Sequence, residues 1–311
     1  MISIIKSIFT LSFLLVVIRL STPILFAGMS SFAASTTGIG NIGVEAIMTM
    51  SALFAILGSY WTQSAILGLL IGMLVGVLMA MMIAFFSMRL GANPTLVGIA
   101  LNTFADSLAI FILYLFTGDK GSSASLAVKT MGTINIPFIK DIPVLGQILS
   151  GQHVLTYVCW ICLIVFGILV FKTPLGLRMR SCGLNPDAAK TAGINVQRLQ
   201  VLSLVFSGIF ASLGGIFLSL NYLLIYSKLM VSGMGWMGIA ANGIASGNYF
   251  LLIVGCLIFG IFRAVSIVFA TTSNFPSDLL TAVPYVAVIV VIVTVSIVNY
   301  LKIKKGNVNE Q

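Results

Sequence analysis

The chain has 311 residues, of which 59% are hydrophobic and 7% are charged, and its formal net charge is +9. Soluble globular proteins contain about 25% charged residues, so this composition excludes an ordinary soluble fold. It predicts a single integral-membrane domain over residues 1–311, surrounded by membrane lipid. The basic residues are divided among a few short segments, which indicates membrane topology and argues against nucleic acid as a partner.

The first predicted elements are two short apolar pieces, residues 8–20 and 22–34, with a polar interruption between them. The first piece follows Lys6 in the manner of a signal peptide. Apolar sequence resumes directly after it and no small-residue cleavage site follows, so we expect an uncleaved first span.

Seven longer apolar runs are each near the roughly 20 residues that a helix needs to cross a bilayer. They are residues 42–60, 64–86, 94–116, 154–171, 201–222, 249–270 and 279–300. A further segment, 233–247, holds five glycines in 15 residues. As a straight helix it would reach only about 22 Å, so we expect it to end within the membrane. The set predicts an all-α integral membrane protein with about ten transmembrane or half-membrane helices.

The distribution of Lys and Arg predicts the orientation in the membrane. Residues 172–200 hold five of the 16 basic residues, and Lys6, Arg89 and the tail after residue 300 hold five more. Because basic loops remain in the cytoplasm, we expect residues 172–200 and both termini there, with residues 118–152 as a partly ordered extracytoplasmic loop. The four basic residues left on the outer side are Lys120, Lys129, Lys140 and Lys228.

The polar segment 172–200 contains the pattern of a complete short helix at residues 185–193. The pattern begins with an amide suited to the N-cap and a proline suited to the first turn. It continues with an acidic and a basic residue placed favourably for the helix dipole, and it ends with a glycine that can close the helix. Two helical turns are unstable alone in water, so we expect a soluble partner to pack on this helix. The residues that carry the pattern are Asn185, Pro186, Asp187, Lys190 and Gly193.

Two stretches share the pattern G-x-G-x-x-G followed by a β-branched residue, at residues 38–44 and 233–239. An apolar run with spaced glycines and then a proline-opened span follow each of them. The first copy runs outward and the second inward, which predicts an inverted repeat of the kind that transporters use to handle solute near the membrane midplane. The pattern also matches a dinucleotide-binding fingerprint, but no strand precedes either copy and no acidic residue follows at the required distance.

Polar and ionisable side chains within the spans are the candidates for a substrate path. A charge at membrane depth costs about 2.5–3.5 kcal/mol on insertion scales, so each needs a partner or a function. The spacing of four residues from Asn41 to Glu45, and from Asn102 to Asp106, places each pair on one helix face. The full candidate set is Asn41, Glu45, Asn102, Asp106, Asn221 and Asn242.

Two interpretations of these residues remain open. In the first, the two helix faces line a path and supply hydrogen bonds to a neutral, polar solute. In the second, Glu45 or Asp106 pairs with an arginine of the spans or with a broken backbone and never meets solute, while Asn221 and Asn242 make hydrogen bonds between helices.

No catalytic or metal-binding set stands out in the sequence. His153 is the single histidine and has no paired Ser or Cys arrangement. Cys159 and Cys162 form a C-x-x-C within an apolar span, where buried thiols are expected. The chain also lacks a GxxxxGK[ST] motif, so we expect no cofactor and no metal on this chain and no catalysis of its own.

The sequence GLRMRSCGLNPDAAKTAGINVQRLQVLSLVFSGIFASLGGIFLSL, residues 176–220, resembles the permease subunits of bacterial ABC importers for branched-chain amino acids, simple sugars and nucleosides. In that family a G-L-R-x-R-A-x-G-x-N-x-x-A-A-x-x-x-G-I loop precedes an S-G-x-x-A-x-L-G-G span. The resemblance implies that this loop is the coupling helix that docks into an ATPase subunit. The residues implied in coupling are Arg178, Arg180, Gly183, Asn185, Pro186, Asp187, Ala188, Ala189 and Gly193.

The first half of the chain is similar to the nucleoside-type branch of this family. Residues 21–26 (STPILF) resemble its T-P-x-x-F-A start, residues 41–45 (NIGVE) its N-I-G-x-E-G motif, and residues 98–102 (GIALN) its G-x-x-L-N motif. Ala46 departs from the pattern, because the family usually has Gly there. The resemblance extends from about residue 21 to residue 284.

The resemblance implies a fold like that of type II importers and a location in the bacterial cell membrane. It implies three partners: an ABC ATPase that holds ATP and Mg²⁺, a second permease that is identical or homologous, and an extracytoplasmic substrate-binding lipoprotein. The expected function is uptake of nucleosides or simple sugars, coupled through residues 185–193. A branched-chain amino acid permease and an ion-coupled secondary transporter, in that order, are the alternatives.

Overall fold

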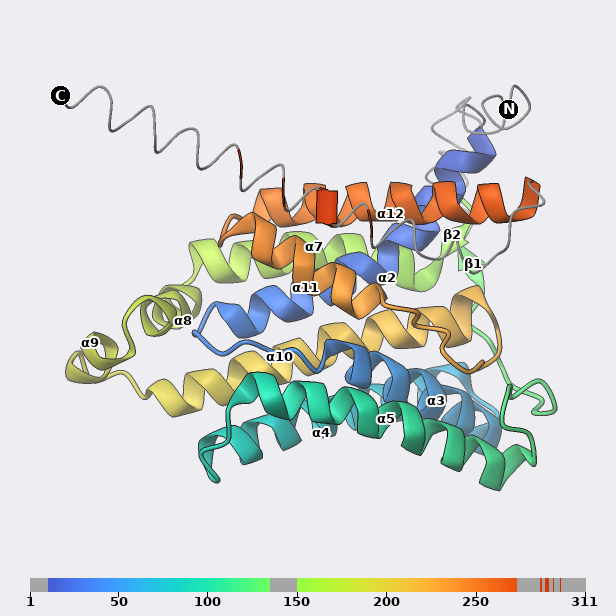
Figure 1. The fold of residues 1–311 in the computed structure, drawn as a ribbon, viewed down its shortest axis with the longest axis horizontal. Helices are drawn as coiled ribbons and strands as arrows, with labels where there is room; N and C mark the ends of the chain where they lie inside the picture. Colours follow the sequence, from blue (N-terminus) through green and yellow to red (C-terminus); the bar gives the residue numbers. More distant parts are fainter. Residues whose placement is uncertain are drawn as a thin grey trace.

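The computed structural model describes residues 11–134 and 150–272, together with positions 286, 289, 290, 293 and 297. Its long helices lie side by side along the longest axis of the molecule (Figure 1). Among the described residues, seven helices are long and apolar enough to cross a membrane, which makes the chain a multi-pass membrane protein. They cover Phe13–Ser35, Val44–Thr62, Ala65–Met88, Pro94–Thr117, Val154–Lys172, Val196–Tyr222 and Tyr249–Ala270.

The first described helix, α2 (Leu11–Ser35), is continuous, so the prediction of two separate pieces at residues 8–20 and 22–34 is wrong. Pro23 lies inside α2 and lacks the usual backbone donor, but packing against neighbouring helices makes such a residue tolerable within a membrane. The hydroxyl of Thr22 donates to the carbonyl of Ile18 at 2.8 Å, which satisfies this polar group within the helix.

The helices α4 (Ala65–Met88) and α5 (Pro94–Thr117) both pack mainly on α3 (Val44–Thr62), and they contact each other less extensively. Within the most apolar part of each helix, 83% of residues are buried in α3 but only 33% in α4 and in α5. The centre of the core therefore contains α3, whereas α4 and α5 expose apolar side chains to the membrane.

A short antiparallel pair forms where the predicted outer loop, residues 118–152, returns to the spans. Strand β1 (Thr133–Ile134) pairs with β2 (Gln152–His153), which leads directly into α7 (Val154–Lys172). The backbone N–H of Ser123 also donates to the carbonyl of Tyr226 at 2.8 Å. The described part of the loop is ordered, and its residues 135–149 lie outside the described residues.

Two short helices follow α7 and extend from one end of the molecule (Figure 1). They are α8 (Pro174–Leu184) and α9 (Pro186–Thr191). The chain then returns through α10 (Val196–Ile216), whose last turns continue as a π-helix, η1 (Phe217–Tyr222). The start of α2 and the β1–β2 pair lie at the opposite end of the molecule.

The helix α11 (Met234–Ala245) has 12 residues and is too short to cross a bilayer, as predicted for residues 233–247. The helix α11 packs on α2 and on α12 (Tyr249–Thr272), and α12 runs along the longest axis of the molecule (Figure 1). The last predicted span, residues 279–300, falls almost entirely outside the described residues.

The two G-x-G-x-x-G stretches occupy different positions relative to the helices that follow them. The last glycine of the first stretch, Gly43, is the N-cap of α3, whereas the first glycine of the second stretch, Gly233, is the N-cap of α11. Both stretches lead into a helix that packs on a following glycine-bearing helix, α4 or α12. The aligned glycines themselves are not structurally equivalent.

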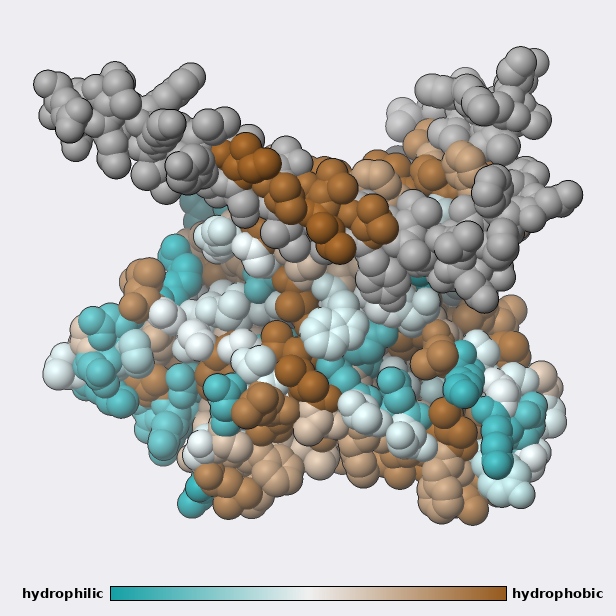
Figure 2. Space-filling view, viewed as in Figure 1, coloured by the Kyte–Doolittle hydropathy of each residue, from teal (hydrophilic) through white to brown (hydrophobic). Residues whose placement is uncertain are grey.

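Hydrophilic residues gather at the two ends of the long axis, over α8 and α9 and over the loop after α5, while apolar residues cover the sides of α4 and α5 (Figure 2). The basic residues of the loops follow this division: Lys172 and Lys190 belong to the α8–α9 end, and Lys120 and Lys129 to the other. The membrane normal therefore runs along the longest axis of the molecule.

Candidate functional site

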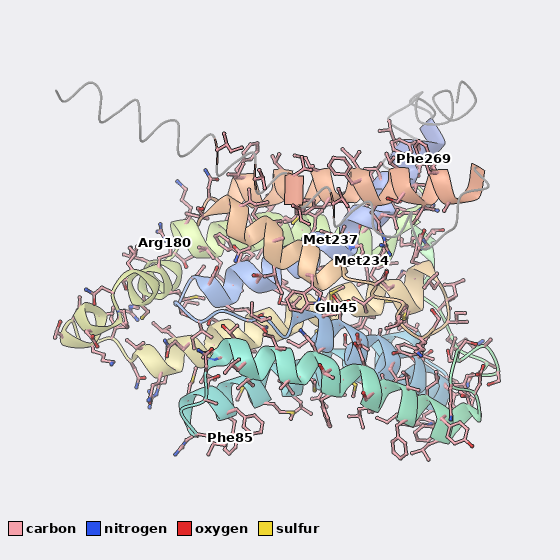
Figure 3. The ribbon with its side chains drawn as sticks, in the orientation of Figure 1. Glu45, Phe85, Arg180, Met234, Met237 and Phe269 are labelled. Carbon is pink, nitrogen blue, oxygen red and sulfur yellow. The ribbon has the colours of Figure 1, made fainter. Side chains whose placement is uncertain are left out.

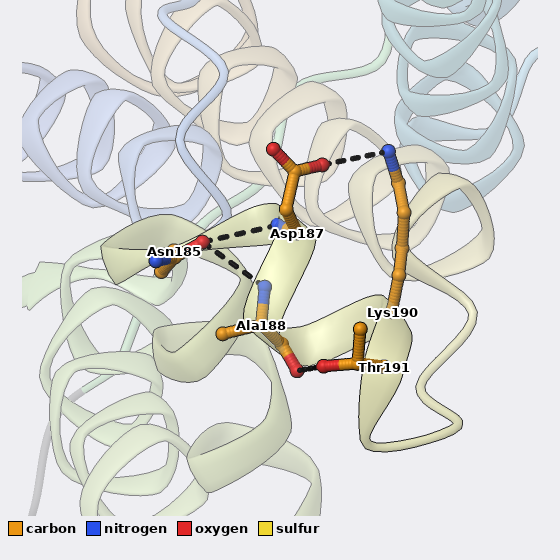
Figure 4. Close-up of polar contacts among 5 residues, drawn as sticks. All are labelled: Asn185, Asp187, Ala188, Lys190 and Thr191. Atoms are coloured by element: carbon orange, nitrogen blue, oxygen red, sulfur yellow. Dashed lines mark hydrogen bonds and ion pairs between the residues drawn. The ribbon is translucent and has the colours of Figure 1, made fainter.

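The helix α9 is capped by Asn185 at its N-terminus (Figure 4), and Gly193 follows its C-terminus in a left-handed conformation. The amide oxygen of Asn185 accepts from the backbone N–H groups of Asp187 at 3.1 Å and Ala188 at 3.0 Å, as the sequence predicted. Beyond the last turn, Gly193 has a φ of 79°, the predicted left-handed conformation. Lys190 and Asp187 lie 3.3 Å apart, but both are exposed, so this ion pair contributes little stability.

The two central alanines of α9 face opposite ways. Ala189 is 4% exposed and packs in a small cluster with Cys182 of α8 and Val196 of α10. Burial raises the pKa of the Cys182 thiol, which favours its neutral, apolar form in this cluster. Ala188 is exposed. One face of α9 therefore attaches the helix to the rest of the molecule, and the opposite face is exposed.

Other residues of the α8–α9 end divide in the same way. Arg178 is exposed, whereas the guanidinium of Arg180 lies 5.1 Å from the ring centroid of Phe171. Leu184, which directly precedes the α9 cap, is 88% exposed. A leucine at this position commonly packs back on its own helix. Because Leu184 projects outward, it is a candidate anchor for a partner, although no motif in the sequence predicted this role.

The end of α8 lies directly against the break between α2 and α3. A Cβ added at Gly183 would come within 2.5 Å of the carbonyl oxygen of Thr36 and 3.2 Å of the backbone nitrogen of Gly38. Only a residue without a side chain permits this approach, because backbone atoms on the other side cannot move aside. The α8–α9 end and the break are thus in direct backbone contact.

The break itself, residues 36–43, is held by buried hydroxyl and amide groups of neighbouring helices. The hydroxyls of Thr37 and Ser203 lie 2.6 Å apart. The Asn41 amide donates to the hydroxyl of Ser207 at 2.8 Å, and its oxygen accepts from the N–H of Gly43 at 2.8 Å. These bonds supply side-chain partners to a stretch of chain in which only residues 36–38 continue the backbone hydrogen bonds of α2.

Two further predicted residues, Asn102 and Glu45, form hydrogen bonds at the first turn of α3. The side chain of Asn102, on α5, accepts from the N–H of Ala46 at 2.9 Å and donates to the carbonyl of Ile42 at 3.0 Å. The carboxylate of Glu45 accepts from the N–H groups of Gly233 at 2.7 Å and Gly235 at 2.8 Å, at the start of α11. We call this meeting point of α3, α5 and α11, formed by Asn41, Glu45, Asn102, Gly233 and Gly235, the junction.

The remaining predicted path residues lie at different distances from the junction. Asp106 is half-buried, one turn beyond Asn102 on α5, and is an electrostatic neighbour of Glu45. Asn242, also half-buried, donates to the hydroxyls of Ser31 and Ser35 on α2. Asn221 is fully buried in η1, and its amide donates to the carbonyl of Met131, close to β1 in the chain, at 3.4 Å.

The structure therefore brings Asn41, Glu45 and Asn102 together, with Asp106 close by, and separates Asn221 and Asn242 from them. A role of these six residues in contacting solute stays a prediction. The serine and threonine hydroxyls that hold the break were not predicted from the sequence, although Ser207 belongs to the S-G-x-x-A motif of the resemblance.

The family of the chain follows from its sequence as a whole. A family model described as "Branched-chain amino acid transport system / permease component" matches residues 13–297. The chain belongs to this family. It is a permease component, which is a transport subunit of a multi-component system, and the resemblance from which this was predicted is confirmed.

Two curated relatives match most of the permease. It is 29% identical over 282 residues to the nucleoside ABC transporter permease protein NupC of Lactococcus lactis subsp. cremoris, covering 88% of each chain. It is 28% identical over 279 residues to the guanosine ABC transporter permease protein NupQ of Bacillus subtilis, covering 86% of this chain and 87% of the relative.

The fold is also that of a solved structure. The structure of PsaBC from Streptococcus pneumoniae in complex with Fab aligns with a TM-score of 0.54 at 13% sequence identity, over 94% of this chain and 95% of that chain. At this identity the similarity concerns the fold alone, and it agrees with the predicted all-α membrane fold.

Proposed function

We propose that this permease is the membrane subunit of an ATP-driven importer that takes up nucleosides, with simple sugars as the second candidate. It works with an ABC ATPase that holds ATP and Mg²⁺, a second permease subunit and an extracytoplasmic binding lipoprotein. The proposal is supported by the family and by the two relatives whose names specify nucleoside and guanosine transport.

The observation that carries the coupling part of this proposal is the exposed face of α9. A six-residue helix is too short to be stable alone, yet α9 is capped at both ends and held on the molecule through Ala189. Its opposite face, with Ala188 and the neighbouring Leu184, is exposed and packs on no other element among the described residues. A groove of the ATPase subunit is the proposed partner of this face.

Through the contact between Gly183 and the break, a movement of α8 on docking can reach the helices within the membrane. A displacement of α8 would push on the backbone at Thr36 and Gly38, because no side chain separates them. The break continues through Asn41 to the start of α3, and Glu45 connects that start to α11. In this proposal, closure of the ATPase moves α8 and α9, and the junction transmits the movement to the half-helix α11.

A neutral solute fits the junction better than an anionic one. Half-helix N-termini in transporters often receive the carboxylate of an anionic substrate, but here Glu45 already accepts the first N–H groups of α11. A branched-chain amino acid would bring its own carboxylate to a site that already contains one. Nucleosides and simple sugars carry no charge and would not meet this repulsion.

The orientation of the permease is part of the proposal. Docking to an ATPase requires α8 and α9 in the cytoplasm, so the β1–β2 end and Leu11 face the outside. Residues 1–10 lie outside the described residues, and a cytoplasmic amino terminus depends on them. The carboxyl terminus after residue 300 also lies outside them, and its basic residues support a cytoplasmic location.

Substitution of Ala188 tests the docking proposal. Ala188→Glu places a charge on the exposed face of α9, and we expect the permease to insert normally but to lose co-purification of the ATPase and transport, because the charge would be buried unpaired in the groove. Ala189→Glu is not equivalent, because Ala189 is buried within the permease and its replacement should loosen α9 itself. Normal uptake in the Ala188→Glu variant would exclude docking through this face.

Deletion of the gene tests the substrate. We expect uptake of a labelled nucleoside to collapse in the deletion strain and to return when the gene is restored, while uptake of labelled leucine is unchanged. The opposite pattern, with leucine uptake lost and nucleoside uptake normal, would show that the solute is a branched-chain amino acid. The assignment as a transporter subunit would still hold.

A further inference from the structure

The carboxylate of Glu45 serves two helix starts at once. It belongs to the first turn of α3, where negative charge stabilises the helix, and it also accepts from the N–H groups of Gly233 and Gly235 at the start of α11. Figure 3 shows Glu45 beside Met234, the first residue of α11, near the middle of the long axis. The side chain is only 9% exposed.

The first turn of α11 has no free donor left for another anion. The N–H of Met234 donates to the carbonyl of Val231 at 3.1 Å, and the N–H of Trp236 also interacts with the Glu45 carboxylate. The two remaining N–H groups of this turn, those of Gly233 and Gly235, are the ones already bound by Glu45. Glu45 therefore occupies the place that a solute carboxylate or phosphate would need.

On the α11 side, the absence of a side chain at Gly235 permits this close contact. A Cβ added at Gly235 would come within 2.6 Å of a Glu45 carboxylate oxygen and 2.8 Å of its backbone nitrogen. A side chain at this position would separate α11 from α3, so the glycine and the carboxylate together define how closely the two helix starts approach.

From this arrangement we propose that Glu45 is a positioning and specificity-determining residue: its carboxylate is a built-in anion that joins the starts of α3 and α11 and excludes anionic solutes from the α11 N-terminus. This deepens the proposed function, on which its transport part rests. In this proposal Glu45 does not touch solute. Its role is to keep α11 aligned and the path selective for neutral molecules.

Removal of the carboxylate should create a site that a small external carboxylate can fill. In Glu45→Ala, the N–H groups of α11 lose an ionic acceptor, and we expect nucleoside uptake into proteoliposomes of the assembled transporter to fall about tenfold or more. Formate, which reproduces the missing carboxylate, should restore uptake severalfold. Formamide, its neutral counterpart, should not, and neither should affect the wild type.

Two further variants separate this role from a general loss of structure. Glu45→Gln fills the same volume without the charge, so we expect reduced uptake that does not respond to formate. Asp119→Asn removes a carboxylate from the exposed outer loop and should leave uptake unchanged. Wild-type uptake in Glu45→Gln would overturn the proposal, because the charge would then be unnecessary.

A binding measurement that needs no transport completes the test. We expect formate to raise the thermal unfolding temperature of the purified Glu45→Ala permease but not that of the wild type. Absence of a formate effect on both unfolding and uptake of Glu45→Ala would overturn the proposal. If formate stabilises the variant while the wild-type transporter imports no nucleoside, the built-in anion stands and the proposed substrate falls.

Discussion

Two polar residues inside the spans of this permease, Glu45 and Asn102, satisfy backbone groups of neighbouring elements. The sequence identifies Asn41, Glu45 and Asn102 as exceptional, because polar groups at membrane depth need partners. It cannot identify the partners: Glu45 is 188 residues from Gly233, and no local spacing rule connects them. One interpretation of the sequence, a carboxylate that pairs with a broken backbone, describes the geometry of Glu45.

The cap of α9 allows a prediction at a single residue. Asn185→Ala removes the acceptor of two N–H groups, and we expect it to destabilise α9 by about 1 kcal/mol. Hydrogen exchange at residues 187–191 should become faster, and ATPase co-purification should weaken. Asn195→Ala is the matched control, because it removes a similar cap from the much longer α10. Unchanged exchange in α9 would mean that partner contacts, and not Asn185, hold its fold.

His153 gives a prediction for pH dependence. Burial, and then the charge of Arg19, lowers the pKa of this imidazole below its ordinary value of 6.5. As the pH falls through that value, the unfolded chain binds a proton that the folded chain resists, so the histidine costs stability on the acidic side. We therefore expect the unfolding temperature of the wild type, relative to His153→Gln, to drop between about pH 7.5 and about pH 5.5. A pH-independent difference would contradict this environment for His153.

At the scale of elements, helix lengths were predictable where composition alone decides them. The six long apolar runs between residues 42 and 270 reappear as helices with ends within about five residues of the prediction, and the short run 233–247 reappears as the half-helix α11. The prediction failed at α2, where the sequence was interpreted as two pieces, 8–20 and 22–34, although the helix continues through Ser21 and Pro23. Tertiary packing compensates for a proline inside a membrane helix, and a single sequence does not reveal that packing.

The contact between α8 and the break allows a prediction for coupling between elements. In Gly183→Ala, the new methyl group meets the backbone at Thr36, so α8 must shift away from the break. We expect the assembled transporter to keep ATP hydrolysis but to lose most nucleoside uptake, because ATPase closure no longer moves the break. A matched control is Gly132→Ala, where a Cβ would meet nothing within 4 Å. Parallel loss of assembly and hydrolysis would show that Gly183 is needed for folding rather than coupling.

At the scale of the whole molecule, the prediction concerns orientation. In a cysteine-free background, a cysteine at Gln197 should react with a membrane-impermeant thiol reagent only after the cells are opened, and one at Ser125 should react in intact cells. Both positions are exposed, whereas the neighbouring Ser123 is 1% exposed and would be a poor probe. Rapid labelling at Gln197 in intact cells, with none at Ser125, would reverse the orientation and place α9 out of reach of an ATPase.

The central claim, that this permease couples ATP hydrolysis to import of a neutral nucleoside, is tested most directly in a purified system. Proteoliposomes would contain the permease, its ATPase, the second membrane subunit and the binding lipoprotein, and labelled nucleoside uptake would be measured with and without ATP. We predict uptake that requires ATP, is competed by unlabelled nucleoside and not by leucine, and is abolished by Ala188→Glu. Uptake that proceeds without ATP, or that leucine competes as strongly as nucleoside does, would contradict the account.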